Sequence, residues 1–236
     1  MKQHLIKSIL NSYPRKPISL PKEYKNLYFK ELKKGRSGKS IISKLVLNME
    51  GWMHKQVVSN KNDLSYLELG CGNLNHLKYQ KFFNSYDVVE PNKTYINDAS
   101  NLRKNKIKNF YNTIFEIRGN KVYDRIISIA VLEHLSDLPK VLKKSNSLLK
   151  SDGLFQAGIP AEGGYFWKLA SNLTTGLSFK IRTGLNYSKL MKYEHLNTAE
   201  EIITLANFFF KEVKIKYYPF NGINFSFYVY IEGKKK

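Results

Sequence analysis

Short apolar runs separated by stretches of helical periodicity occupy the middle of the chain. Runs of this length and content are typical of buried strands. Five strands are expected, at Leu64–Leu69, Tyr86–Glu90, Lys108–Tyr111, Arg125–Ala130 and Leu154–Ile159. Helices are expected at Asn75–Asn84, Lys93–Asn105, Leu138–Leu149 and Ala199–Phe208. Since strands that alternate with helices pair in parallel, the pattern predicts an α/β fold with a doubly wound, mostly parallel sheet.

Two further runs near the C-terminus alternate apolar and polar residues with a period of two. Their apolar positions are Val213, Ile215 and Tyr217 in the first run, and Phe225, Phe227, Val229 and Ile231 in the second. The turn-forming residues Pro219 to Gly222 lie between them. This arrangement predicts an antiparallel hairpin that closes the sheet.

Two segments break the alternation of strands and helices. Residues 1–60 contain three prolines and a helical pattern from about Ser37 to Val58, which predicts a helical cap. Residues 160–197 are rich in glycines and aromatic residues and predict an insertion over the active face. We therefore divide the chain into a basic N-terminal cap (1–60) and a main domain (61–236) that carries the insertion.

The 236 residues carry a formal net charge of +20, and half of that excess lies in residues 1–60, with 13 Lys/Arg and 3 acids. We interpret most of these lysines as solvated surface, and leave an anionic small molecule, RNA or a membrane surface as possible partners. No apolar run reaches the roughly 18 residues of a membrane-spanning helix, and one cysteine allows no intrachain disulfide. We expect a cytoplasmic protein; its oligomeric state stays open.

The strongest local signal follows the first expected strand, where Glu68 precedes a loop of Gly70, Cys71, Gly72 and Asn73. Glycines at the end of a buried strand let the backbone approach a ligand closely. Glu90 stands 22 residues after Glu68, at the end of the next strand, where an acid binds ribose hydroxyls. Asn75 replaces the third glycine of a dinucleotide motif, and Glu68 would repel a diphosphate, so a cationic nucleoside is favoured over NAD.

With these residues in place, the chain from about Leu64 to Ile159 resembles the class I S-adenosylmethionine-dependent methyltransferases, in particular small-molecule enzymes of the type 11/12-like subgroup with a Glu-His pair after the fourth strand. The resemblance implies a Rossmann-like, seven-stranded sheet with an antiparallel C-terminal strand, and S-adenosylmethionine as cofactor. The implied cofactor-binding residues are Glu68, Gly70, Cys71, Gly72, Asn73, Glu90, Pro91, Asn92, Asn112, Thr113, Ile114, Ser128 and Ala130. The chain departs from the family pattern at Leu74, often a glycine, and at Asn112, often an aspartate.

Methyl transfer to a hydroxyl requires a base, and a histidine with a pKa of ~6.5 suits that role. His134 follows the fourth strand beside Glu133, and His195 precedes a helix, so these three residues are the catalytic candidates. Either histidine can be the base. The three can also bind a divalent ion, as in the small-RNA 2′-O-methyltransferases that the Glu-His pair resembles. Since Ala130 replaces a further glutamate of those enzymes, we assign no metal.

The insertion supplies candidate acceptor contacts, because flat rings stack on sugars and arginine pairs with phosphate. They are Tyr165, Trp167, Arg182 and Tyr193, and packing within a lid is the alternative role for the aromatic residues. We expect O-methylation of a sugar or other small polar acceptor, anionic through a nucleotide or phosphate, and the resemblance implies surface (capsular or lipopolysaccharide) polysaccharide biosynthesis. RNA ribose 2′-O-methylation through the basic N-terminal region, and a non-catalytic nucleoside-binding homologue, are the alternatives; methylation of nucleic-acid bases is not expected.

Overall fold

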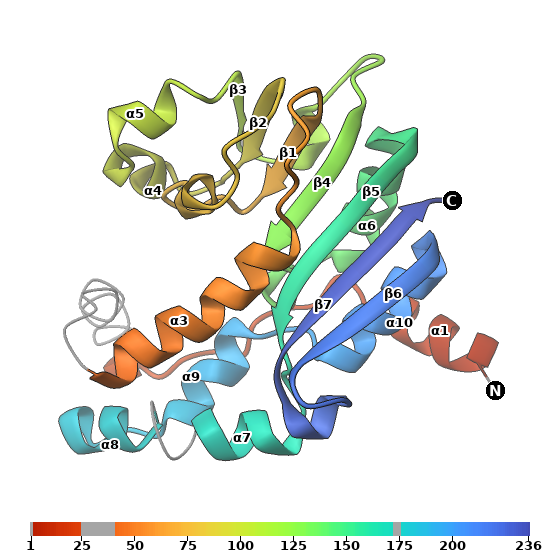
Figure 1. Ribbon diagram of the computed structural model, residues 1–236. Coiled ribbons are helices and arrows are strands. Elements are labelled where there is room, and N and C mark those ends of the chain that lie inside the picture. Colours follow the sequence, from red (N-terminus) through yellow and green to blue (C-terminus); the bar gives the residue numbers. More distant parts are fainter. Residues whose placement is uncertain (1, 25–40, 172–175) are drawn as a thin grey trace.

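The computed structural model describes residues 2–24, 41–171 and 176–236, and their seven strands form a single mixed sheet (Figure 1). The strands are β1 (Ser65–Leu69), β2 (Ser85–Val89), β3 (Asn109–Tyr111), β4 (Tyr123–Ile129), β5 (Leu149–Pro160), β6 (Phe210–Pro219) and β7 (Ser226–Lys235). Their order is β3-β2-β1-β4-β5-β7-β6. Strands β1 to β5 pair in parallel, and β7 runs antiparallel to both β5 and β6. The predicted seven-stranded, Rossmann-like sheet and its C-terminal hairpin are confirmed.

Helices cover both faces of this sheet. They are α1 (Lys2–Asn11), α3 (Ile41–Gln56), α4 (Lys93–Asp98), α5 (Asn101–Lys104), α6 (Leu138–Leu148), α7 (Tyr165–Ser171), α8 (Leu177–Thr183), α9 (Tyr187–Glu194) and α10 (Ala199–Phe209). Short 3₁₀ turns lie at η1 (Asn75–Lys78), η2 (Ile114–Glu116), η3 (Leu132–His134) and η5 (Ile223–Phe225). None of the helices in the described ranges is long and apolar enough to cross a membrane.

Two apolar clusters fill the space between the layers. On one face of the sheet, α6 and α10 pack against alternate residues of β1, β4, β5 and β7, among them Leu67, Ile126 and Phe155. On the other face, side chains of η1 and of the segment after α3 pack on Tyr66, Tyr86 and Ile127. The parallel strands are therefore buried on both faces, and the loops at their carboxyl ends remain available for a ligand.

The N-terminal helices pack against the main domain. Helix α1 lies against α10 and contributes Ile9 to the core, and Arg15 forms a two-pronged ion pair with Glu201, at 2.6 and 2.9 Å. Helix α3 crosses β5 and β7, where Gly158 leaves room for Met53. The helix predicted over residues 37–58 is thus observed as α3, while residues 37–40 lie outside the described ranges.

Two of the predicted helices are wrong in extent. The helix expected at 75–84 is only the short turn η1, because buried Gln80 binds the backbone of Ser59 and Phe82 through its amide and holds the chain in an irregular path. The helix expected at 93–105 is divided into α4 and α5. Ala99 is extended and buried there, and Ser100 begins a new helix.

The insertion at 160–197 forms α7, α8 and α9, which lie together beyond the end of β5 (Figure 1). This is the end of the sheet at which the parallel strands finish. Leu196 and Asn197 then return to the main domain, where their amides donate to the carbonyl oxygen of Glu133. The insertion therefore joins the carboxyl edge of β4 directly.

Candidate active site

The glycine loop leaves β1 at the centre of the sheet. Gly70 and Gly72 both have positive φ, +67° and +50°, which glycine adopts without strain. A Cβ on Gly70 would lie 2.3 Å from a methyl group of Val131, so this glycine is required by packing. A Cβ on Gly72 would meet nothing within 4 Å. The loop is therefore fixed on one side and open on the other, where a ligand can approach its backbone.

Glu90 connects the loop to the end of β2. One carboxylate oxygen accepts the amide of Gly72 at 2.9 Å, and the other accepts the amide of Asn92 at 2.9 Å. The carboxylate thus lies between the β1 and β2 loops, at the position expected for a ribose contact. Asn92 in turn caps α4 by accepting from the amide of Thr94. Glu90, Gly72 and Asn92, predicted separately from the sequence, lie together.

Glu68 lies beneath the same loop and is almost completely buried. Desolvation by burial raises the pKa of its carboxyl to about 8, with a further contribution from the negative charge of Glu90, while a hydrogen bond from the Tyr86 hydroxyl at 2.9 Å opposes the shift. A buried carboxyl with a raised pKa gains from a cationic ligand, because the positive charge stabilises its ionised form. This electrostatic environment suits a sulfonium compound with an ammonium group.

Leu74 occupies the place at which the family often has glycine, and its backbone keeps the conformation that glycine prefers. Its φ is +61°, and its side chain is fully buried in the cluster beneath the loop. A leucine in the left-handed region is strained by roughly 1–2 kcal/mol, and burial of the side chain offsets that cost. The loop of this chain therefore has a buried leucine with a left-handed backbone at this position.

The remaining cofactor candidates lie along the same edge of the sheet. Ser128 pairs with Leu69 in the ladder between β4 and β1 and has a buried hydroxyl without a hydrogen-bond partner. Ala130 has a φ of +53° as the chain leaves β4. After β3, Asn112 binds the carboxylate of Glu116 through its backbone and side-chain amides. Of its two neighbours, Thr113 caps η2 and Ile114 is buried in the core, while Cys71, Asn73 and Pro91 remain in the β1 and β2 loops.

A second group of titratable side chains follows β4. Glu133 is buried, and one of its carboxylate oxygens has no hydrogen-bond partner. His134 and His195 meet edge to face, with ring centroids 4.9 Å apart, although 60 residues separate them in the chain. One ligand atom from each of Glu133, His134 and His195 lies within 4.8 Å of the others. The structure brings the three catalytic candidates together, and their chemistry suits either proton transfer or a divalent cation.

Glu162 completes this group and was missed by the sequence analysis. Its carboxylate accepts from Nδ1 of His195 at 2.9 Å and from the indole nitrogen of Trp167 at 2.5 Å. Burial disfavours the charged imidazole of His195, but the hydrogen bond to Glu162 and the negative charge of Glu133 outweigh it and raise the pKa of His195 above 6.5. In the sequence, Glu162 is only an acidic residue near the start of the insertion, and no motif marks it.

The two histidines are oriented alike. Nδ1 of His134 donates to the carbonyl oxygen of Glu194 at 2.8 Å, and Nδ1 of His195 donates to Glu162. In the neutral form each ring then carries its lone pair on Nε2. Burial raises the pKa of Glu133, and the two imidazoles oppose that shift.

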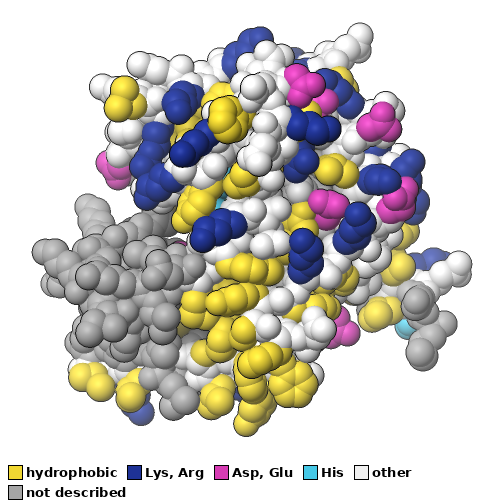
Figure 2. Space-filling model, in the orientation of Figure 1, with side chains coloured by type: hydrophobic (Ala, Val, Ile, Leu, Met, Phe, Trp, Pro, Cys, Tyr) yellow, Lys and Arg dark blue, Asp and Glu magenta, His cyan; other side chains and the backbone are white. Residues whose placement is uncertain are grey.

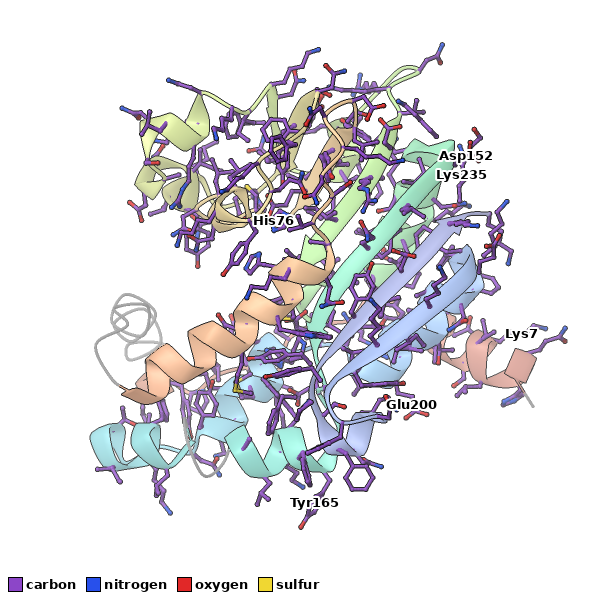
Figure 3. The ribbon with its side chains drawn as sticks, in the orientation of Figure 1. Lys7, His76, Asp152, Tyr165, Glu200 and Lys235 are labelled. Atoms are coloured by element: carbon purple, nitrogen blue, oxygen red, sulfur yellow. The ribbon has the colours of Figure 1, made fainter. Side chains whose placement is uncertain are left out.

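The four acceptor candidates do not lie in one place. Trp167 lies beside Glu162 and His195, and its ring also contacts Tyr228. Tyr165 projects outward from α7 (Figure 3). Tyr193 packs against a small cluster formed by Leu20, Tyr24, Phe179 and Leu190. The side chain of Arg182 lies outside the described residues.

A profile of the methyltransferase domain family matches residues 39–182, more than half of the chain. The chain belongs to this methyltransferase family. The match begins just before α3 and ends within α8, so it contains the glycine loop, Glu90 and the Glu133-His134 pair. No curated protein matches significantly.

Solved structures share the fold of this methyltransferase at low sequence identity. A S-adenosylmethionine-dependent methyltransferase from Thermotoga maritima, described as a possible histamine N-methyltransferase, is 17% identical with a TM-score of 0.59, over 90% of this chain and 96% of that one. The plantazolicin methyltransferase BpumL, bound to S-adenosylhomocysteine, is 16% identical with a TM-score of 0.59 over 100% of both chains. The N-methyltransferase NodS from Bradyrhizobium japonicum, with the same ligand, is 14% identical with a TM-score of 0.55, over 85% and 90%.

The methyltransferase is therefore a class I, S-adenosylmethionine-dependent enzyme. Its residues fit that cofactor: Gly72 is open to a ligand, Glu90 presents a carboxylate between two loops, and Glu68 is a buried carboxyl whose ionised form a cationic ligand stabilises. The cofactor supplies an electrophilic methyl group on a sulfonium. The chain must supply the binding site and a group that removes the proton from the acceptor.

Proposed function

We propose that this methyltransferase methylates a hydroxyl group of a small polar acceptor, with His195 as the general base. The observation that carries the proposal is the contact between His195 and Glu162, made beside Glu133 and His134 at the carboxyl edge of β4. A histidine held by a carboxylate at Nδ1 has a defined tautomer, and its imidazolium is stabilised when it forms.

The reaction is an in-line displacement at the methyl carbon. The acceptor oxygen forms the new C–O bond while the C–S bond breaks, and the hydroxyl proton passes to Nε2 of His195. Glu162 stabilises the resulting positive charge, and Trp167 holds Glu162 in place through the indole hydrogen bond. His134 lies against His195 and is the second candidate for the base.

The proposed acceptor is a sugar or a related polar group linked to a phosphate or nucleotide, in the cytoplasm and on the way to a surface polysaccharide. The family resemblance is the basis for the pathway, the aromatic residues of the insertion are the basis for the sugar, and the single cysteine is the basis for the compartment. An anionic acceptor is supported by residues 163–193, which contain five Lys/Arg and no Asp or Glu. An amine is the alternative, because two of the similar structures are named as N-methyltransferases.

The test compares His195→Ala and His134→Ala with His4→Ala, an exposed histidine on α1, using a panel of nucleotide sugars, phosphorylated sugars and amines. Loss of the base should lower kcat by on the order of 10²–10⁴ without weakening cofactor binding. We expect this loss for His195→Ala, a smaller one for His134→Ala and none for His4→Ala. Calorimetry with S-adenosylhomocysteine reports cofactor binding separately.

The pH profile gives a second readout. The base must be neutral to accept a proton, so activity should rise with pH, and because the pKa of His195 is raised, the midpoint should lie above 6.5. Glu162→Gln should move that midpoint downward. Methylation of amines but of no hydroxyl acceptor would contradict the proposal. If a chelator abolishes activity and a divalent cation restores it, a metal ion and not His195 would be responsible for removing the acceptor proton.

A further inference from the structure

An apolar surface lies at the end of the molecule that carries the insertion. We call it the α7 face and define it by Tyr165 and Leu169 on α7 and by Phe220 and Phe225 around η5. These side chains are 65%, 45%, 61% and 54% exposed. Hydrophobic side chains gather at this end of the molecule in Figure 2, and Tyr165 points away from the body in Figure 3. Large apolar side chains that gather on a surface mark a site of interaction.

The side chains of the α7 face are held in place by packing contacts beneath them. The ring of Phe166 lies beneath it and contacts Phe220, Phe225 and Phe227, with centroid distances of 6.5, 5.6 and 6.3 Å. Gly164 lets the start of α7 approach η5, since a Cβ there would lie 2.3 Å from the carbonyl oxygen of Ile223. The exposed rings are therefore held in place before any partner binds.

The segments that form this face carry no acidic residue. Residues 163–193, which include α7, α8 and α9, contain five Lys/Arg and no Asp or Glu, and residues 219–227 around η5 contain no charged residue. Lys168 lies on α7 between Tyr165 and Leu169, and it is exposed. Lys180 on α8 and Lys189 and Lys192 on α9 are exposed as well. Exposed rings beside exposed lysines are typical of peripheral membrane-binding surfaces, because the rings enter the headgroup region and the cations meet anionic lipids.

We propose that the α7 face docks on an anionic lipid surface. Charge decides between this partner and a second copy of the chain. A symmetric dimer through the face would bring two chains of +20, with the same lysines, against each other, whereas an anionic bilayer neutralises them. The chain then lies on the membrane without spanning it. Since α7 follows β5 after only four residues, docking places the carboxyl edge of the sheet, with its candidate active site, near the lipid headgroups.

The test is sedimentation of the full chain with vesicles of phosphatidylcholine, with and without phosphatidylglycerol. We expect binding to the anionic vesicles that weakens as salt is added. The double variant Phe220→Ser/Phe225→Ser should bind at least roughly 10-fold more weakly, because two rings no longer enter the interface. The matched control is Phe82→Ser/Phe115→Ser, which removes two rings that are 48% and 49% exposed elsewhere, and it should bind within about 2-fold of the parent.

Three outcomes overturn the proposal. If the parent chain does not bind anionic vesicles, an anionic lipid surface is not the partner. If the two double variants bind equally well, the binding depends on charge alone and not on the α7 face. A dimer in light scattering that only the Phe220→Ser/Phe225→Ser variant disrupts would assign the face to a second copy. Calorimetry with S-adenosylhomocysteine checks that each variant is folded. Because vesicle binding is measured without an acceptor, its result is independent of the reaction proposed above.

Discussion

Four carboxylates near the carboxyl edge of the sheet have different environments and therefore different roles. Glu68 is buried and its pKa is raised, so it suits a cationic ligand. Glu90 is partly exposed and accepts two backbone amides. Glu133 has an unpartnered buried oxygen, and Glu162 binds His195 and Trp167. Residue type and spacing indicated the first three, but burial and partners separate their functions.

Glu90→Ala tests the cofactor site at the scale of one residue. Removing the carboxylate eliminates the charged acceptor for the ribose hydroxyls and releases the amides of Gly72 and Asn92. We expect the free energy of S-adenosylmethionine binding to weaken by roughly 2–4 kcal/mol, or about 30- to 1,000-fold in Kd, measured by calorimetry. Asp152→Ala, an exposed acid near the start of β5, is the control. Unchanged affinity in Glu90→Ala would show that the ribose binds elsewhere.

At the scale of elements, local signals predicted most strands and some helix ends correctly. The helix expected from Ala199 begins at that residue, because Thr198 caps it and forms a capping box with Glu201. The helix predicted after the glycine loop failed because the long-range bonds of Gln80 to Ser59 replace helical hydrogen bonds. The division between α4 and α5 likewise depends on burial of Ala99. The local pattern of apolar and polar residues does not contain information on these long-range contacts, so it could not predict either irregularity.

The two loop glycines should respond differently to the same substitution. Gly70→Ala adds a clash with Val131 to the strain of a positive φ, and should lower the free energy of unfolding by about 2–4 kcal/mol. Gly72→Ala introduces only the backbone strain, about 1 kcal/mol in stability, but places a methyl group on the open side of the loop and should weaken cofactor binding. Denaturant unfolding and calorimetry measure the two effects. Equal losses of stability would refute the assignment of Gly70 to packing.

At the scale of the whole molecule, charge and burial set the pH range in which the fold is stable. His54 on α3 and His76 on η1 are in hydrogen-bond contact at 3.1 Å and stack with Tyr79 between the helical layer and the sheet. Desolvation by burial lowers the pKa of His54 to about 4 and that of His76 to about 3, with smaller contributions from Lys78 and from His54, respectively. Both imidazoles are therefore neutral in the folded protein near pH 7.

This pair predicts a loss of stability in acid. The unfolded chain takes up protons on both histidines below pH ~6.5, while the folded chain resists protonation until its lower pKa values are reached. The free energy of unfolding should fall between pH 6.5 and about 4, by about 1.4 kcal/mol per pH unit for each histidine, or about 5 kcal/mol for the pair at pH 4.5. Glu68, whose pKa is raised, contributes in the opposite direction, so the comparison is made against His54→Gln/His76→Gln. The free energy of unfolding is measured with denaturant across this pH range for the parent and for the variant. If the two curves run parallel, the prediction is wrong.

The sequence by itself determined the order of strands and helices, the glycine loop, Glu90 and the Glu133-His134 pair, because these depend on periodicity and on spacing within one strand–loop unit. Only the tertiary structure placed His195 against His134, introduced Glu162 and exposed the α7 face. These features join segments far apart in the chain, and the path of the intervening backbone decides which side chains are buried, paired or exposed.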